Sequence, residues 1–193
     1  RRPDVAGMTE HNSVQQPLVD ELVRLGWSYF PGKTLDRQLE QVFVESEVVD
    51  ALVRLNPDVA EVPARASEVV KLLRNLTFQV GDEGLVETNR DAMSWLRGLQ
   101  THKFVGADAF RPVRLIDFEN PSNNRFVVAD EVSFGSPGNK ARFDIVLFVN
   151  GLPLGIIELK NPAEEKATIR HAFNQLQTYK AQIPTLFAYN AAL

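Results

Sequence analysis

The sequence of 193 residues contains no cysteine. This absence excludes a disulfide framework, a thiolate metal site and a cysteine nucleophile. A chain without disulfides is typical of a reducing compartment, so we expect a cytoplasmic protein. No apolar run approaches the roughly 18 residues that suggest a membrane span, and the opening residues RRPDVAGMTEHNS lack the apolar core of a secretory signal. We therefore expect no membrane partner.

An excess of basic charge is also missing. The chain has 21 lysines and arginines against 25 aspartates and glutamates, which gives a formal net charge of -4. A domain that binds nucleic acid through its overall charge is strongly basic, and this one is not. An anionic substrate would therefore have to meet a local basic patch or a bound cation.

The hydrophobic content of 44% is sufficient for one domain. The first residue is not methionine, and the last segment, PTLFAYNAAL, stops in apolar material. We therefore expect residues 1–193 to form a single domain that is a fragment of a longer chain.

The hydrophobic pattern changes near Val113. Before it, segments such as SVQQPLVDELVRLGW and PARASEVVKLLRNL carry apolar residues at helical spacing, so residues 1–100 are predicted to be mostly helical. Over residues 110–193 the stretches VRLIDF, NRFVVADEVSF, ARFDIVLFV and LGIIELK predict strands. A helix over NPAEEKATIRHAFNQLQTYKAQ and a last strand over IPTLFAY follow. This order favours an α/β fold in which helices flank a mixed β-sheet.

The segment GWSYFPGKT, from Gly26 to Thr34, ends like a phosphate-binding loop. It has five residues between its first glycine and Gly-Lys-Thr, where the motif has four, and Gly26 ends a predicted helix rather than a strand. We therefore expect no nucleotide site in this fragment.

The stretch FDIVLFVNGLPLGIIELK is apolar enough for a buried strand pair, yet it carries Asp144 near one end and Glu158 and Lys160 near the other. Buried charges are costly unless they are paired, hydrogen-bonded or bound to metal. Glu158 and Lys160 are two residues apart, so on a strand both side chains face the same side. The charges therefore indicate more than a structural hairpin.

The length of the turn decides whether Asp144 lies beside Glu158. A two-residue turn at Asn150 and Gly151 would pair Asp144 with Ile157, whereas a three-residue loop would pair it with Glu158. We expect an irregular or odd-length loop that brings the two carboxylates together.

Two adjacent carboxylates repel unless a cation lies between them. Mg²⁺ binds carboxylate and carbonyl oxygens and leaves room for phosphate oxygens, and the main-chain carbonyl of Leu159 would lie beside such a site. Lys160 could hold an attacking water or stabilise charge on a phosphate. The alternative is a salt-bridged strand end, with Asp144 paired to Arg142 and Glu158 to Lys160. Spacing alone does not decide between these interpretations.

The surrounding sequence resembles the N-terminal nuclease domain of the restriction (R, motor) subunit of type I restriction–modification enzymes, a branch of the PD-(D/E)xK superfamily. The resemblance rests on VRLIDFENPSNNRFVV, ARFDIVLFVNGLPLGIIELKNP, AFNQLQTYK and IPTLFAYNA, with a weaker match in TEHNSVQQPLVDELVRLGW. It implies a restriction-endonuclease-like core with a helical N-terminal portion.

The resemblance also implies roles for individual residues. Asp144 and Glu158 would bind the metal and Lys160 would be the catalytic lysine. Gln175 and Tyr179 would form an accessory motif beside the active site, and their spacing of four places them on one flank of a helix.

Two further positions complete the comparison with the family. Glu10 matches an acidic residue at the start of the family's first helix, often an additional contact of the metal site. Phe143 is a departure, because the family usually has proline before the aspartate.

By resemblance, the protein is an Mg²⁺-dependent endonuclease that cuts unmodified double-stranded DNA after ATP-driven translocation. ATP would serve motor domains elsewhere in the full-length subunit, and the methyltransferase and specificity subunits would be partners. Two alternatives stay open: a stand-alone nuclease of the same superfamily acting in repair or defence, and a non-catalytic module that docks the subunit to its partner methyltransferase or to DNA.

Overall fold

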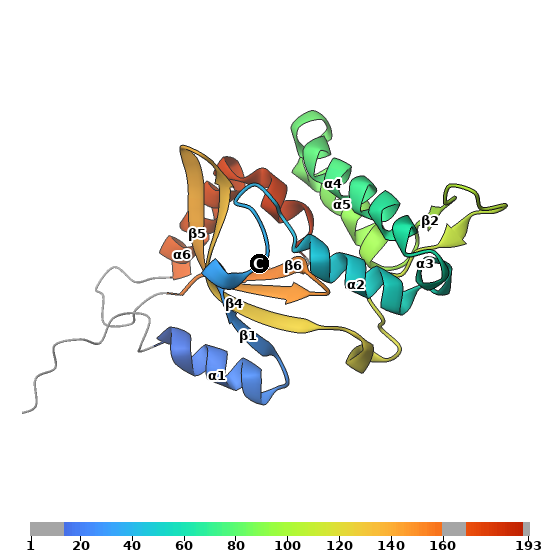
Figure 1. Cartoon of the computed structure of the whole chain (residues 1–193). Coiled ribbons are helices and arrows are strands. Elements are labelled where there is room, and N and C mark those ends of the chain that lie inside the picture. Colours follow the sequence, from blue (N-terminus) through green and yellow to red (C-terminus); the bar gives the residue numbers. More distant parts are fainter. Residues whose placement is uncertain (1–13, 160–168, 191–193) are drawn as a thin grey trace, which may run out of the picture.

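The structure is a computed structural model that describes residues 14–159 and 169–190. Its centre is a four-stranded sheet in the order β1-β4-β5-β6, with helices on both faces (Figure 1). Strand β1 runs parallel to β4, and the other neighbours are antiparallel. The mixed α/β fold expected from the sequence is therefore confirmed. The strands of this sheet are β1 (Ser28–Pro31), β4 (Phe126–Ser136), β5 (Asn139–Val149) and β6 (Leu152–Ile157).

Helices and short 3₁₀ turns connect and cover the strands. The α-helices are α1 (Gln16–Arg24), α2 (Glu45–Leu55), α3 (Pro57–Glu61), α4 (Ala66–Glu83), α5 (Leu85–Leu96) and α6 (Ile169–Gln182). The 3₁₀ turns are η2 (Gly32–Thr34), η3 (Pro63–Arg65), η4 (Pro121–Asn123) and η5 (Pro184–Ala188), and a small separate sheet pairs β2 (Thr101–His102) with β3 (Arg111–Pro112). None of the helices in the described part of the chain is long and apolar enough to cross a membrane.

The sheet separates two clusters of buried side chains. The main core lies between one face of the sheet and helices α2, α4, α5 and α6, and the α1 core lies on the other face, where Val19 packs against Val128 and Ile145. In α4 the apolar residues recur at three- and four-residue intervals, so one stripe of the helix is buried. Gly84 follows with a φ of 87°, a left-handed conformation that ends the helix.

Three segments differ from the expected elements. The segment Ser28–Pro31, in the portion predicted to be mostly helical, is an edge strand, where a terminal proline is tolerated. IPTLFAY was predicted to be a strand and forms η5, whose Leu186 and Phe187 are buried. A short apolar run has the same composition in a strand and in a buried turn, so its pattern cannot distinguish them. VRLIDF, from Val113 to Phe118, is likewise not a strand.

Side-chain amides replace a strand ladder around VRLIDF. Asn56 Oδ1 accepts the N–H of Arg114 at 2.7 Å, and Asn56 Nδ2 donates to the Arg114 carbonyl at 2.8 Å. Asn150 Nδ2 donates to the carbonyl of Leu115 at 2.8 Å and to Asn124 Oδ1 at 2.9 Å. These bonds tie the segment to α2 and to the turn between β5 and β6.

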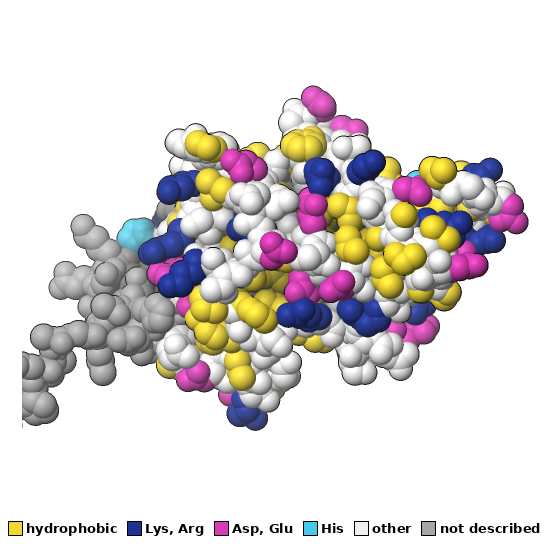
Figure 2. Space-filling view, in the orientation of Figure 1, with side chains coloured by type: hydrophobic (Ala, Val, Ile, Leu, Met, Phe, Trp, Pro, Cys, Tyr) yellow, Lys and Arg dark blue, Asp and Glu magenta, His cyan; other side chains and the backbone are white. Residues whose placement is uncertain are grey.

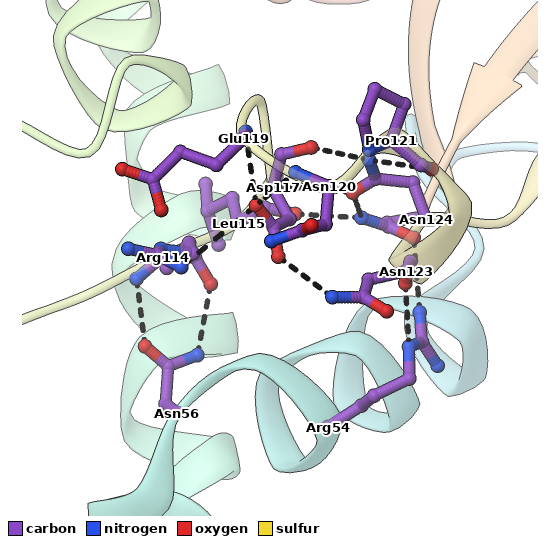
Figure 3. Close-up of polar contacts among 11 residues, drawn as sticks. Arg54, Asn56, Arg114, Leu115, Asp117, Glu119, Asn120, Pro121, Asn123 and Asn124 are labelled. Atoms are coloured by element: carbon purple, nitrogen blue, oxygen red, sulfur yellow. Dashed lines mark hydrogen bonds and ion pairs between the residues drawn. The ribbon is translucent and has the colours of Figure 1, made fainter.

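Asp117 is the charged centre of this polar network (Figure 3). One carboxylate oxygen accepts the N–H groups of Glu119 and Asn120, and the other accepts Asn123 Nδ2 at 2.9 Å. The bonds from Asn123 and Asn120 favour the ionised form and lower the pKa of Asp117. The network holds the start of β4 beside the turn that precedes β6.

Candidate active site

The β5–β6 hairpin turns at Asn150 and Gly151, between the paired residues Val149 and Leu152. Their φ angles of 50° and 81° are those of a type I′ turn, which an Asn-Gly pair favours. The loop therefore has two residues, and the expectation of an odd-length loop is wrong.

A bulge in β6 restores the register that the two-residue turn would have prevented. Phe148 pairs with Pro153, but Leu147 pairs with Gly155, so Leu154 is an extra residue on β6. Pro153 has no N–H to donate to the ladder, which favours an irregularity here. The shift pairs Ile145 with Ile157.

The carboxylate of Asp144 lies at the end of β6. Continuing the register of Ile145 and Ile157 by one residue places Glu158 across from Asp144. Asp144 Oδ2 accepts the main-chain N–H of Leu159 at 2.8 Å. Asp144, Glu158 and Leu159 are all half-buried. Asp144 and the main chain of Leu159 thus meet at the end of the hairpin, with Glu158 next to Leu159 in the chain, while Lys160 and Glu10 lie outside the described residues.

The accessory pair lies on α6 and contacts the strand that carries Asp144. Gln175 Nε2 donates to Tyr179 Oη at 2.6 Å. The Tyr179 ring centroid lies 4.6 Å from that of Phe143, which is fully buried. Phe143 also contacts the rings of Phe134 and Phe187. Phe143, the residue before Asp144, therefore joins β5 to α6.

Arg142, which the salt-bridge alternative assigns to Asp144, forms an ion pair with Glu131 in the adjacent strand. Arg142 Nη1 and Glu131 Oε1 are 3.1 Å apart, and about half or more of each side chain is exposed. Exposed pairs of this kind contribute little to stability.

Asp130 is a buried carboxylate that sequence reasoning did not single out. It lies on β4 opposite Ile145, and it accepts Gln15 Nε2 at 3.2 Å and the Tyr29 hydroxyl at 3.0 Å. Burial, and then the bond to Asp130, raises the pKa of Tyr29 to about 12. An acid among apolar strand residues, in VVADEV, is the only sequence signal that could have drawn attention to it.

Within residues 14–159 and 169–190, no group of three His, Cys, Asp or Glu side chains is placed to hold a metal. The oxygen donors that the sequence predicted at the hairpin end are the carboxylates of Asp144 and Glu158 and the carbonyl of Leu159. This oxygen-only set fits a hard cation such as Mg²⁺, which takes few protein ligands and completes its shell with water or phosphate.

The family model and the similar proteins found by comparison all belong to type I restriction enzymes. The family model of the type I restriction enzyme R protein N terminus matches residues 7–193. The HindI endonuclease subunit of a type I restriction enzyme from Haemophilus influenzae is 37% identical, over 96% of this chain and 18% of its own length.

A putative type I restriction enzyme endonuclease subunit, MjaIXP, from Methanocaldococcus jannaschii is 28% identical over 97% of this chain and 18% of its own length. The SsaAORF53P endonuclease subunit from Staphylococcus saprophyticus is 39% identical over 62% of this chain. The chain thus spans less than a fifth of the length of the curated relatives it matches. Because the family model covers nearly the whole chain, the protein belongs to the family of type I restriction enzyme R protein N termini.

Proposed function

We propose that this domain is the Mg²⁺-dependent DNA endonuclease part of a type I restriction enzyme. The observation that carries the proposal is the hydrogen bond from the Leu159 N–H to the Asp144 carboxylate at the end of the β5–β6 hairpin, which brings Asp144 beside the chain that carries Glu158. The family membership supports it, because the relatives are named endonuclease subunits. The β6 bulge produces a register in which two half-buried acids stand across from each other. Placing carboxylates in this way costs folding stability, so the register is better explained by function.

In this mechanism Asp144, Glu158 and the carbonyl of Leu159 hold the cation. When bound there, Mg²⁺ would supply a water of lowered pKa and would offset charge on the scissile phosphate. The N–H of Leu159 fixes the orientation of the Asp144 carboxylate. Lys160 orients the attacking water or stabilises negative charge on a phosphate oxygen.

Residues outside the hairpin hold the site in place. Tyr179 buttresses the strand that carries Asp144 through Phe143, and Gln175 fixes the Tyr179 hydroxyl. Glu10 is proposed to contact the cation or its water shell, as its position in the family pattern implies.

The proposal extends to the complete subunit. The domain cuts unmodified foreign double-stranded DNA in the cytoplasm, after motor domains elsewhere in the subunit have translocated the DNA with ATP. Methyltransferase and specificity subunits supply target recognition. This division of labour is consistent with a nuclease domain whose own net charge is -4.

The test is a set of substitutions in the complete enzyme. Asp144→Asn, Glu158→Gln and Lys160→Ala are expected to reduce DNA cleavage at least about 100-fold, a usual effect of removing a group that stabilises the transition state. ATPase activity and translocation should stay near the wild-type values. Asp108→Asn is the matched control, because Asp108 is an exposed acid paired with Arg111 away from the hairpin.

Two outcomes decide between the proposal and a docking module. If the Asp144 and Lys160 variants still cut DNA, the catalytic assignment is wrong and a docking role is favoured. Crystals soaked in Mn²⁺ provide a readout independent of cleavage: we expect an anomalous peak between the carboxylates of Asp144 and Glu158.

A further inference from the structure

Strands β4 and β5 both change faces at the same level of the sheet. Side chains in a regular strand alternate, so residues two apart share a face. At one place on each strand, however, two residues instead of one separate successive main-core residues. This break lies between Ala129 and Val132 on β4 and between Phe143 and Val146 on β5. The main-core residues are Val127, Ala129, Val132 and Phe134 on β4, and Ala141, Phe143, Val146, Phe148 and, beside the turn, Val149 on β5.

The register of the two strands is the same on both sides of this break. Asp130 pairs with Ile145 and Val132 with Phe143, so Glu131 stands across from Asp144. In Figure 1 the β4–β5 hairpin bends between its base beside β6 and its tip. The candidate catalytic aspartate is therefore located where β5 changes faces.

Glu131 has a left-handed backbone, with a φ of 48°. Glycine adopts this conformation freely and asparagine tolerates it, but it is unfavourable for a glutamate. Strained residues persist where their surroundings determine them, and they concentrate at functional sites. Here both neighbours are fixed: Asp130 is buried and accepts bonds from Gln15 and Tyr29, and Val132 is fully buried in the main core.

The strain has a consequence for Asp144. Irregularities in strands beside active sites redirect side chains. The β6 bulge sets the register that places Glu158 across from Asp144, at the level where β5 changes face, and Asp144 Oδ2 receives the N–H of the next residue, Leu159. Phe143 and Ile145, on either side of Asp144, are buried on opposite faces of the sheet.

We propose that Glu131 is a positioning residue whose left-handed backbone sets the orientation of Asp144 toward the Glu158 side of the hairpin. This inference rests on the proposed function of that site. The Glu131 side chain is exposed and pairs with Arg142 on the surface, so the role belongs to the backbone conformation.

The test is a series of substitutions at residue 131 in the complete enzyme. Glu131→Gly and Glu131→Asn permit the left-handed conformation, Glu131→Gln retains the side-chain shape without its charge, and Glu131→Val opposes the conformation because it is β-branched. We expect the first three to cleave DNA within about twofold of wild type. Glu131→Val should lower kcat about tenfold or more with KM for DNA unchanged, because a small misplacement of a catalytic group has a large effect on rate.

Two further measurements separate positioning from folding. Ser133→Val is the matched control, since it places the same side chain on the same strand, two residues beyond Glu131. It should leave kcat unchanged. Mn²⁺ titration of the same variants should show about tenfold weaker binding for Glu131→Val alone, as expected for misdirected ligands. If Glu131→Val fails to fold, Glu131→Ala provides a milder opposition to the left-handed conformation.

The outcomes are distinguishable. Wild-type kcat and Mn²⁺ affinity in folded Glu131→Val, or in folded Glu131→Ala where the valine variant does not fold, would overturn the positioning role. So would an equal loss in Glu131→Gly and Glu131→Asn, because the side chain would then be responsible. Asp144→Ala is measured in parallel: if it cuts DNA normally, the proposed function itself is wrong, whereas an inactive Asp144→Ala beside an active Glu131→Val rejects only the positioning role.

Discussion

At the scale of single residues, the hairpin depends on the close approach of Gly151 to the start of α2. The carbonyl of Gly151 accepts the N–H of Val44 at 2.9 Å. A Cβ added at Gly151 would lie 2.5 Å from the Val44 carbonyl oxygen and 2.7 Å from Glu47 Cβ. Both groups lie in the packed N-terminal turn of α2, so neither can move away freely. Only glycine fits this place in the turn.

We therefore predict that Gly151→Ala destabilises the protein by about 2–4 kcal/mol, the sum of left-handed strain and overpacking. Gly138→Ala is the control, because Gly138 has a φ of 88° but nothing within 4 Å of an added Cβ. Its cost should be about 1–2 kcal/mol, from backbone strain alone. Denaturant unfolding of both variants measures the difference. Equal losses would show that the contact with α2 is unimportant.

At the scale of elements, α6 contacts strand β5 through an aromatic pair beside Asp144. Tyr179 packs on Phe143, next to Asp144, and Gln175 binds the Tyr179 hydroxyl one helical turn earlier. The ring supplies packing and the hydrogen bond supplies orientation, so the two contributions can be separated by substitution.

We predict that Tyr179→Phe and Gln175→Met each lower DNA cleavage, and that the double variant is little worse than either single one. The shared hydrogen bond should give a coupling of about 1 kcal/mol in a double-mutant cycle. Gln177→Met, an exposed position on the same helix, is the control and should have no effect. Fully additive losses would mean that the two residues act independently.

Whether a helix or strand could be predicted from the sequence depended on the length of its apolar pattern. The long strands β4 and β5 and the helix α4 were predictable, because their apolar periodicity extends over many residues. β1 and η5 were not, because each is short and takes its conformation from what it packs against. The VRLIDF segment was mistaken for a strand because its carbonyl and N–H partners are side chains of Asn56 and Asn150, which are distant in sequence.

At the scale of the whole molecule, charge limits what the domain can do by itself. The net charge is -4, and on the face shown in Figure 2 lysines and arginines are interspersed with aspartates and glutamates. Non-specific DNA affinity comes from neutralising phosphates with clustered basic side chains. The surface in view offers no extended cluster of this kind.

We accordingly predict that residues 1–193 alone bind double-stranded DNA weakly, with a Kd above about 1 µM at physiological salt, and cut it poorly. Fluorescence anisotropy at low and moderate salt, with the complete enzyme as the comparison, measures this. Tight and strongly salt-dependent binding by the isolated chain would contradict the prediction.

The sequence by itself determined the α/β class, the family, and the set of charged residues around the β5–β6 hairpin, because these depend on local pattern and residue type. The tertiary structure decided how those residues are brought together. A two-residue turn followed by a bulge at Leu154 produces the register that the sequence suggested through a different loop. The left-handed Glu131 and the change of faces at Asp144 have no signal in the sequence, because a backbone conformation of this kind is imposed by the packing of its neighbours on opposite faces of the sheet.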